Sequence, residues 1–242
     1  MRPYEMLARY YDQEWGRWGT QYVKLVSWIT GTYEYPIKSV VDLACGIGTL
    51  LTELERNGYD VLGIDLSSDM IDRAKILNPD IDYIVGDMAT VVIPNQVDLT
   101  ICSFDSLNYL VDEGHLVRAL NNIHRMLKPC GFFVFDINTP HLYEERHHGT
   151  IEREFSGARF QQILSYDRQQ RLASTVFDFG EGRTEEHIQR AYRVQDMRDR
   201  LHAAGFDTLG TFENFDLTAA SEASSKAIFL ARSFGTTDAM RH

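Results

Sequence analysis

Cysteine is scarce in this chain, and its few thiols are not grouped. Cys45, Cys102 and Cys130 are spread over 242 residues, each in or beside an apolar stretch. An odd number of distant cysteines argues against a disulfide framework, and no two of them are spaced to anchor a zinc site. The sequence therefore predicts buried, reduced thiols and no metal centre.

Long apolar runs and an excess of basic charge are also missing. No apolar run approaches the roughly 20 residues of a membrane helix, and the first residues lack the apolar core of a signal peptide. The net charge of −11 disfavours nucleic acid held by phosphate contacts. We expect a cytoplasmic protein with a small-molecule partner and no nucleic-acid or membrane partner, and the sequence leaves monomer and dimer open.

What the chain does contain is an alternation of strands and helices from residue 39 onward. The predicted strands are Ser39–Leu43, Asp60–Ile64, Asp82–Val85, Val97–Cys102 and Gly131–Asp136, and the predicted helices are Leu50–Asn57, Ser68–Leu77 and Asp112–Leu127. Such alternation favours right-handed βαβ units in a mostly parallel sheet. A sheet of this kind binds ligands at the carboxyl ends of its strands.

The flanking segments follow other patterns. Residues Glu5–Thr30 have helical apolar spacing, interrupted by an aromatic elbow at Trp15–Gly19, which predicts two helices. Residues 141–193 are predicted to form an antiparallel insertion with strands Arg159–Tyr166, Arg171–Phe179 and Thr184–Arg193. We divide the chain into an N-terminal helical lid (1–38), a Rossmann-like core that binds the cofactor (39–140), an insertion that caps the substrate (141–193), and a C-terminal helix and strands that complete the core (194–242).

A glycine loop follows the first predicted strand, within the run VVDLACGIGTL. Dinucleotide-binding loops have a third glycine where this chain has Leu51, and phosphate-binding loops end in Gly-Lys-Ser/Thr, which is absent. A ligand without phosphates, but with an adenosine and an amino-acid end, fits a loop that lacks both features.

Two carboxylates support this interpretation. Asp65 ends the second predicted strand, 19 residues after Gly46, where a carboxylate can accept both hydroxyls of a ribose. A simple strand-end or capping aspartate is the alternative. Asp87 follows the third strand, where it can accept the exocyclic amine of adenine while Met88 packs on the ring.

Five segments resemble, in order, the class I S-adenosylmethionine-dependent methyltransferase family. They are VVDLACGIGTL, VLGIDLSSDMIDRAK, YIVGDM, VDLTICSFDSLNYL and LKPCGFFVFDINTP. The resemblance covers Ser39–Pro140 and implies an α/β fold, a Rossmann-like seven-stranded sheet with helices on both faces and an antiparallel last strand. It implies S-adenosyl-L-methionine as cofactor and S-adenosyl-L-homocysteine as product.

The resemblance also implies the cofactor contacts. It places Gly46 and Gly48 beside the methionine portion, Asp65 on the ribose, and Asp87 with Met88 at adenine. The full expected set is Asp42, Ala44, Cys45, Gly46, Gly48, Asp65, Leu66, Met70, Gly86, Asp87, Met88, Ser103 and Phe104. Ile47 stands where many relatives have Thr, and we expect its side chain to face away from the cofactor.

The expected chemistry is in-line displacement of a methyl group from a sulfonium, which needs alignment and water exclusion more than a dedicated catalytic group. The candidate catalytic residues are Tyr11, Asp105 and His187, with aromatic packing, helix capping and an ordinary strand position as their respective alternatives. The candidate substrate contacts are Trp15, Asn108, Tyr109, Asn138, Arg190 and Tyr192. In the run EEHIQRAY, His187 and Arg190 lie on opposite strand faces, so only one face can meet the site. The adjacent His147 and His148 point oppositely and are discounted as a metal pair.

The favoured function is transfer of a methyl group to an N or O atom of a small molecule. The alternatives are a methyltransferase acting on protein or nucleic acid, a non-catalytic S-adenosylmethionine-binding protein, and an NAD-dependent dehydrogenase. DNA-amine enzymes of the family carry a proline-containing element where this chain reads Ser103-Phe104-Asp105-Ser106. The missing third glycine and Met88 disfavour the dehydrogenase. The identity of the acceptor cannot be inferred from the sequence.

Overall fold

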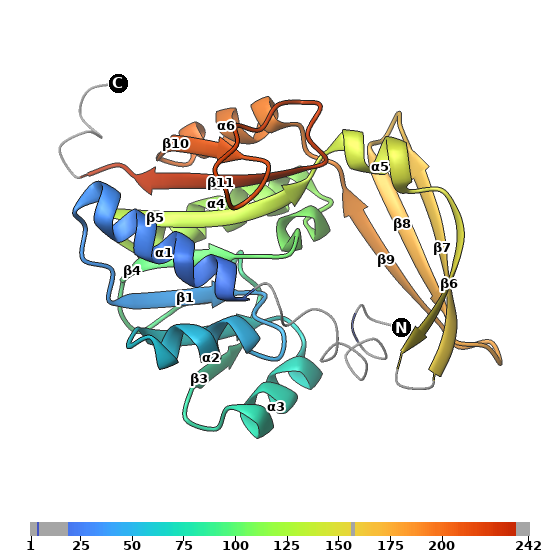
Figure 1. Cartoon of the computed structure of the whole chain (residues 1–242), viewed down its shortest axis with the longest axis horizontal. Coiled ribbons are helices and arrows are strands. Elements are labelled where there is room, and N and C mark those ends of the chain that lie inside the picture. Colours follow the sequence, from blue (N-terminus) through green and yellow to red (C-terminus); the bar gives the residue numbers. More distant parts are fainter. Residues whose placement is uncertain (1–3, 5–18, 156–157, 236–242) are drawn as a thin grey trace.

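The computed structural model describes residues 4, 19–155 and 158–235, which form two β-sheets with their helices (Figure 1). The helices are α1 (Gly19–Tyr33), α2 (Thr49–Arg56), α3 (Ser68–Leu77), η3 (Ser106–Tyr109), α4 (Glu113–Met126), α5 (Pro140–Arg146) and α6 (Val194–Ala203). The strands are β1 (Ser39–Leu43), β2 (Asp60–Asp65), β3 (Asp82–Val85), β4 (Val97–Cys102), β5 (Leu127–Asn138), β6 (Gly149–Phe155), β7 (Ala158–Asp167), β8 (Leu172–Asp178), β9 (Thr184–Arg190), β10 (Phe206–Phe212) and β11 (Lys226–Ser233).

The larger sheet has seven strands in the order β10-β11-β5-β4-β1-β2-β3. Strands β1 to β5 are parallel, and β11 runs antiparallel between β5 and β10. The predicted fold class is therefore confirmed, including the antiparallel last strand. The strand order reverses between β1 and β4, which is where an open α/β sheet binds its ligand.

Alternating side chains of this sheet enter two hydrophobic cores. Val40 and Phe132 pack with α1 and α2 on one face, and their chain neighbours Val41 and Phe133 pack with α4 and α6 on the other. Both faces are therefore covered, as a parallel sheet requires. The side chains on the two faces are largely removed from water.

The second sheet has four antiparallel strands in the order β6-β7-β8-β9, and Figure 1 shows it on the side of the large sheet where β1 and β5 end, joined to that sheet through α5. The insertion is therefore antiparallel, as predicted. It also contains a fourth strand, β6, and a helix, α5, which the sequence did not predict. Strand β6 has three consecutive charged residues, Glu152–Glu154, and α5 has only seven residues, so neither shows a clear apolar pattern. Pro140 at the start of α5 was the available signal.

The predicted elements of the core agree closely with the structure. Helix α3 has the predicted bounds, while α2 and α4 differ from prediction by one residue at each end. Strand β5 begins at Leu127 rather than Gly131. Of the two predicted N-terminal helices, α1 contains most of the second, and the first lies outside the described residues.

Leu51 stands where a dinucleotide loop has its third glycine. Its side chain fits because the residue opposite it on β2, Gly63, has no side chain. A Cβ on Gly63 of β2 would lie 2.7 Å from Leu51 Cδ1 and 2.5 Å from Tyr83 Cδ1. Leu51 is itself completely buried. The close approach of helix and strand is thus kept, with the glycine on the strand instead of the helix.

We expect Gly63→Ala to lower the free energy of unfolding by about 1–3 kcal/mol, because the methyl group overpacks a filled site. Gly31→Ala in α1 is the matched control, since its Cβ would meet no atom within 4 Å, and it should be neutral or stabilising by up to ~1 kcal/mol. Urea unfolding of both variants tests this. Equal stability of the two variants would contradict the account.

Candidate active site

The loop between β1 and α2 forms the floor of a cavity at the carboxyl edge of the large sheet. Ala44, Gly46 and Gly48 have φ angles of 55°, 55° and 79°, a left-handed backbone that favours glycine. The cavity is lined by Asp42, Ala44, Cys45, Gly46, Ile47, Thr49, Leu50, Ser103 and Phe104. Six of these residues are predicted cofactor contacts, and the structure brings them together. Ile47 also lines the cavity and is buried against Met70, and the expectation that its side chain faces away from the cofactor stays a prediction.

Asp42 is the buried acid of this cavity. Its side chain is 1% exposed, and Oδ1 has no hydrogen-bond partner among the described residues. Burial and the neighbouring Asp65 raise the pKa of Asp42 well above its ordinary value. An unpartnered buried carboxyl oxygen is unfavourable unless a donor reaches it. The site is therefore suited to a cationic group of a ligand.

Asp65, at the end of β2, holds the glycine loop in place. Its Oδ2 accepts the Gly46 N–H at 2.8 Å and its Oδ1 accepts the Ser67 N–H at 2.8 Å. Burial raises its pKa, although these backbone N–H groups act in the opposite direction. Each oxygen keeps a lone pair for a further donor. Asp65 thus makes the backbone contacts expected of an aspartate at a strand end. Its two oxygens can still accept hydrogen bonds from two hydroxyl groups of a ligand.

Asp87 follows β3 at the same edge and is fixed by two donors. The Ala89 N–H donates to Oδ1 at 2.8 Å, and His115 Nε2 of α4 lies 3.1 and 3.0 Å from the two carboxyl oxygens. Asn122 supports the turn by donating to the carbonyl oxygen of Met88 at 3.0 Å. Gly86, which precedes Asp87, donates its N–H to the Asp65 carbonyl oxygen at 2.9 Å.

The turn after β4 is strained and is tied to β5. Phe104 and Asp105 both have left-handed backbones, with φ angles of 57° and 48°, which cost energy in residues other than glycine. Their N–H groups donate to the two oxygens of Asp136, at 2.7 and 3.0 Å. Asp136 is 2% exposed and also binds Lys226 Nζ at 2.6 Å. This carboxylate therefore maintains a conformation that brings Ser103 and Phe104 to the cavity.

The side chain of Asp105 does not cap η3, so the capping alternative is wrong for this residue. Its Oδ2 accepts a hydrogen bond from Gln189 Nε2 of β9 at 2.6 Å, and Oδ1 lies 3.6 Å from Lys226 Nζ. Burial raises the pKa of Asp105, and the nearby Lys226 counteracts this. Asp105 therefore connects the large sheet to the inner face of the small one.

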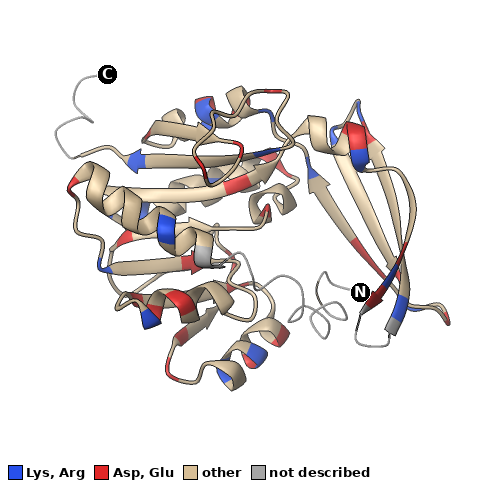
Figure 2. Cartoon of the chain, in the orientation of Figure 1, with Lys and Arg blue, Asp and Glu red and all other residues tan. Residues whose placement is uncertain are grey.

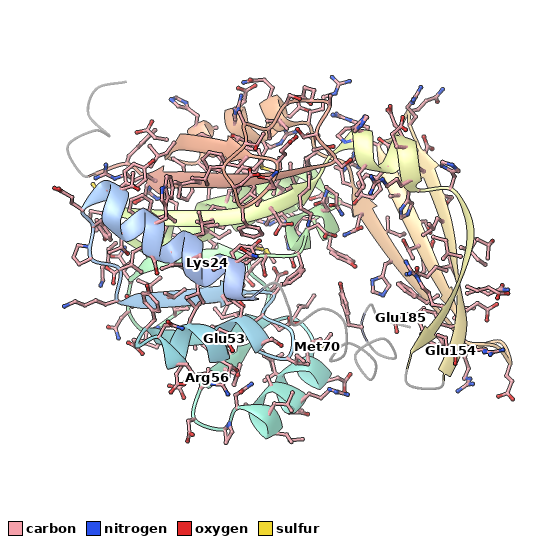
Figure 3. All side chains as sticks on the ribbon, viewed as in Figure 1. Lys24, Glu53, Arg56, Met70, Glu154 and Glu185 are labelled. Atoms are coloured by element: carbon pink, nitrogen blue, oxygen red, sulfur yellow. The ribbon has the colours of Figure 1, made fainter. Side chains whose placement is uncertain are left out.

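The inner face of β9 carries Glu185, His187 and Gln189, which are 0%, 3% and 9% exposed. His187 Nδ1 lies 2.7 Å from the hydroxyl oxygen of Tyr109, and His187 Nε2 lies 2.7 Å from Glu185 Oε1. Of the two faces that the sequence left open, the one with His187 therefore meets the site. Figure 3 labels Glu185 on β9 and Met70 on α3, on either side of this region.

Comparison with known proteins agrees with this geometry. The family model described as "Methyltransferase domain" matches residues 40–131. The putative methyltransferase YqeM of Bacillus subtilis is 26% identical over 243 residues, covering 95% of this chain and 96% of the relative. A putative methyltransferase of a Geobacillus species is 27% identical over 208 residues, covering 81% and 84%. These matches support a class I S-adenosylmethionine-dependent methyltransferase.

The fold of this methyltransferase matches solved structures over its full length. An S-adenosylmethionine-dependent methyltransferase from Clostridium acetobutylicum superposes with a TM-score of 0.79 at 22% identity, covering 96% of each chain. The family cofactor, S-adenosylmethionine, fits the residues described above. Its ammonium group could donate to the unpartnered oxygen of Asp42, and its ribose hydroxyls could donate to the remaining lone pairs of Asp65.

Several residues predicted to bind the acceptor hold the methyltransferase together. Asn108 is completely buried, and its amide nitrogen donates to the carbonyl oxygens of Asn138 and Arg190 at 2.9 and 2.7 Å. Arg190 Nε donates to the Val111 carbonyl oxygen at 2.6 Å. The buried Tyr192 hydroxyl donates to the Leu110 carbonyl oxygen. Burial raises the pKa of Tyr192 to about 12. The polar groups of these three residues are engaged by backbone atoms, and their contact with an acceptor stays a prediction.

The remaining predicted residues occupy varied positions. Tyr11 and Trp15 lie outside the described residues, so their roles stay predictions. Leu66 is 73% exposed directly after β2, whereas Met70 is buried against Ile47. His147 Nε2 lies 3.1 Å from the carbonyl oxygen of Ser174.

Sequence reasoning missed three residues of the site. Glu185 had a signal, because it lies two positions before His187 and thus on the same strand face. Lys226 reaches the site because β11 pairs it with Asn138. Tyr4 gave no signal, although its ring packs on Ile47 and Met70. Contacts of this kind depend on strand pairing and on long-range packing.

We expect Asp136→Asn to lower the free energy of unfolding by about 2 kcal/mol, because an amide nitrogen replaces one acceptor of the 104–105 turn and Lys226 loses its partner. Asp60→Asn, at an exposed carboxylate of β2, is the matched control and should change stability by no more than ~0.5 kcal/mol. Urea unfolding at pH 7 measures both. Indistinguishable variants would show that Asp136 does not support the turn.

Proposed function

We propose that this methyltransferase transfers a methyl group from S-adenosylmethionine to an N or O atom of a small molecule bound between the two sheets. The main support is that buried polar side chains of β9 face the carboxyl edge of the sheet that carries the glycine loop. Tyr4 connects the two sides, since it packs on Ile47 and its N–H donates to Glu185 Oε1 at 2.6 Å. An acceptor placed there would lie beside the methionine end of the cofactor.

Relatives that act on amino sugars support a small-molecule acceptor. The dTDP-3-amino-3,6-dideoxy-α-D-glucopyranose N,N-dimethyltransferase of Streptomyces fradiae is 32% identical over 98 residues, which is 40% of this chain. The sugar N-methyltransferase KedS8 from Streptoalloteichus has a related fold, with a TM-score of 0.73 at 20% identity. The acidic character of the site suits a cationic amine, because Figure 2 shows acidic segments at the carboxyl ends of β1 and β5 and on β9.

The protein's part in the reaction is to bind, align and exclude water. S-adenosylmethionine supplies an activated methyl group. Asp42 would hold its ammonium group, Asp65 the ribose, and Asp87 with Met88 the adenine. The small sheet closes the site opposite the loop, so that the acceptor can be held about 3 Å from the methyl carbon in a dry setting. Asp105 and His187 are the described polar groups that can orient or deprotonate it.

We expect Asp42→Asn to weaken S-adenosylmethionine binding about 10- to 100-fold, as expected for losing one charged hydrogen bond. Methylthioadenosine, which has no ammonium group, is the control ligand and should bind both proteins alike. Because the pKa of Asp42 is raised in the protein alone, a cation at this site must displace its proton. Affinity should therefore rise with pH in the wild type and not in the variant. Calorimetry that finds equal affinities would refute the Asp42 role.

The proposed function is tested by a labelled-methyl transfer screen over amino-sugar nucleotides, simple amines and hydroxylated metabolites, with peptides and nucleic acid included. We expect label in a small-molecule amine or hydroxyl. Label only in peptide or nucleic acid would support a macromolecular substrate instead. Cofactor binding without transfer to any acceptor would favour a non-catalytic binding protein.

A further inference from the structure

A continuous row of hydrogen bonds leads from the cofactor loop into the small sheet. Tyr4 packs on Ile47 of the glycine loop, and its hydroxyl lies 2.9 Å from the hydroxyl of Tyr109. Tyr109 contacts His187 Nδ1 at 2.7 Å, and His187 Nε2 contacts Glu185 Oε1 at 2.7 Å. The residues come from the N-terminal segment, η3 and β9, so only the fold brings them together.

The chemistry of the groups gives this row a direction. The Glu185 carboxylate accepts the Tyr4 N–H as well as His187, and two donors favour its ionised form, which can only accept. His187 must then carry its hydrogen on Nε2, which leaves Nδ1 as an acceptor for the Tyr109 hydroxyl. The Tyr109 oxygen in turn accepts from Tyr4. Within this row, the Tyr4 oxygen is thus the acceptor that lies nearest the glycine loop.

The surroundings of the imidazole leave it few other partners. The titratable or charged described groups that face His187 are Glu185 on its own strand, Tyr109 on η3 and Tyr4. Phe177 of β8 packs on the ring, with 4.9 Å between centroids. Asp105 is engaged by Gln189 and Lys226. Glu185 is therefore the acid that stabilises a protonated His187.

We propose that Tyr4, Tyr109, His187 and Glu185 form a proton relay that takes the proton lost by the methyl acceptor, and that this acceptor is an amine. The inference rests on the proposed function. As the acceptor nitrogen gains the methyl group, the carbon–sulfur bond breaks and its electron pair stays on sulfur. The acceptor's proton passes to the Tyr4 oxygen, the proton of Tyr4 to Tyr109, and that of Tyr109 to His187 Nδ1. The positive charge of the sulfonium ends on the imidazolium beside Glu185.

The relay favours an amine over an aliphatic hydroxyl because its final base is an imidazole. A neutral imidazole can share the proton of an ammonium group, whereas an aliphatic hydroxyl gives up its proton only to a much stronger base. Burial raises the pKa of Tyr4 well above its ordinary value, so the phenol stays neutral and can donate and accept at once. His187 is the proton acceptor of the relay. Glu185 acts through His187 and is a positioning residue.

The state of His187 can be read without any acceptor, by nitrogen NMR of ¹⁵N-histidine-labelled protein with His187→Gln as the assignment control. We expect the Nε2–H form of His187 in the wild type. Glu185→Gln should weaken this preference, because a side-chain amide can donate to Nε2 as well as accept from it. Glu186→Gln is the matched control, since this acid lies on the outer face of β9 and binds Ser174 Oγ at 2.6 Å. It should leave His187 unchanged.

Turnover of the amine found in the transfer screen provides the second readout. His187→Gln and Tyr109→Phe should lower kcat about 100-fold, because each interrupts the transfer of the proton to Nδ1. Glu185→Gln, which acts through His187, should lower kcat as well. Glu186→Gln should behave as wild type. Tyr109→Phe, which loses only a hydroxyl group, tests the relay even if Glu185→Gln fails to fold.

The relay is wrong if His187 carries its hydrogen on Nδ1, or if His187→Gln and Tyr109→Phe keep the wild-type kcat. It is also wrong if the only acceptor is a hydroxyl. A failure of the proposed function would look different, because no small molecule would then receive the methyl group. The NMR result does not depend on transfer and would still test the hydrogen-bonded row.

Discussion

The site depends on one buried carboxylate, Asp136, at the carboxyl end of β5. Its two oxygens accept the N–H groups of Phe104 and Asp105, and they also bind the hydroxyl of Tyr22 from α1 and Nζ of Lys226 from β11. Charged hydrogen bonds are strong enough to offset two left-handed residues in succession. A single side chain thus fixes the turn after β4, the first described helix and the antiparallel strand relative to one another.

The two sheets contribute different residues to the rest of the site. The parallel sheet presents the glycine loop with Asp42, Asp65 and Asp87 at the ends of its strands, which suits a class I methyltransferase cofactor. The antiparallel sheet presents Glu185 and His187 on its inner face. Among the described residues no helix has the length and apolar character of a membrane span, and no three His, Cys, Asp or Glu side chains are grouped as metal ligands. The described side chains that form the row of hydrogen bonds beside the loop are two tyrosines, a histidine and a glutamate.

The cofactor side could be predicted because it follows from local patterns. A strand, a glycine turn and a helix start are adjacent in sequence, and parallel strands place Asp65 and Asp87 at one edge. The acceptor side could not, because it depends on pairing and packing between distant segments. The choice of the His187 face over that of Arg190 and the burial of Asn108 both follow from how the small sheet meets η3. The sequence also did not predict the short helix α5 or the edge strand β6, because neither has a clear apolar pattern.

We propose above all that the methyl group is delivered into the space between the loop at Ile47 and the inner face of β9. A crystal structure with S-adenosylhomocysteine and an amine acceptor measures this most directly. We predict that the ammonium group lies on Asp42 and that the sulfur faces Tyr4 and Tyr109. A sulfur that points away from β9, or an acceptor bound outside the two sheets, would contradict it.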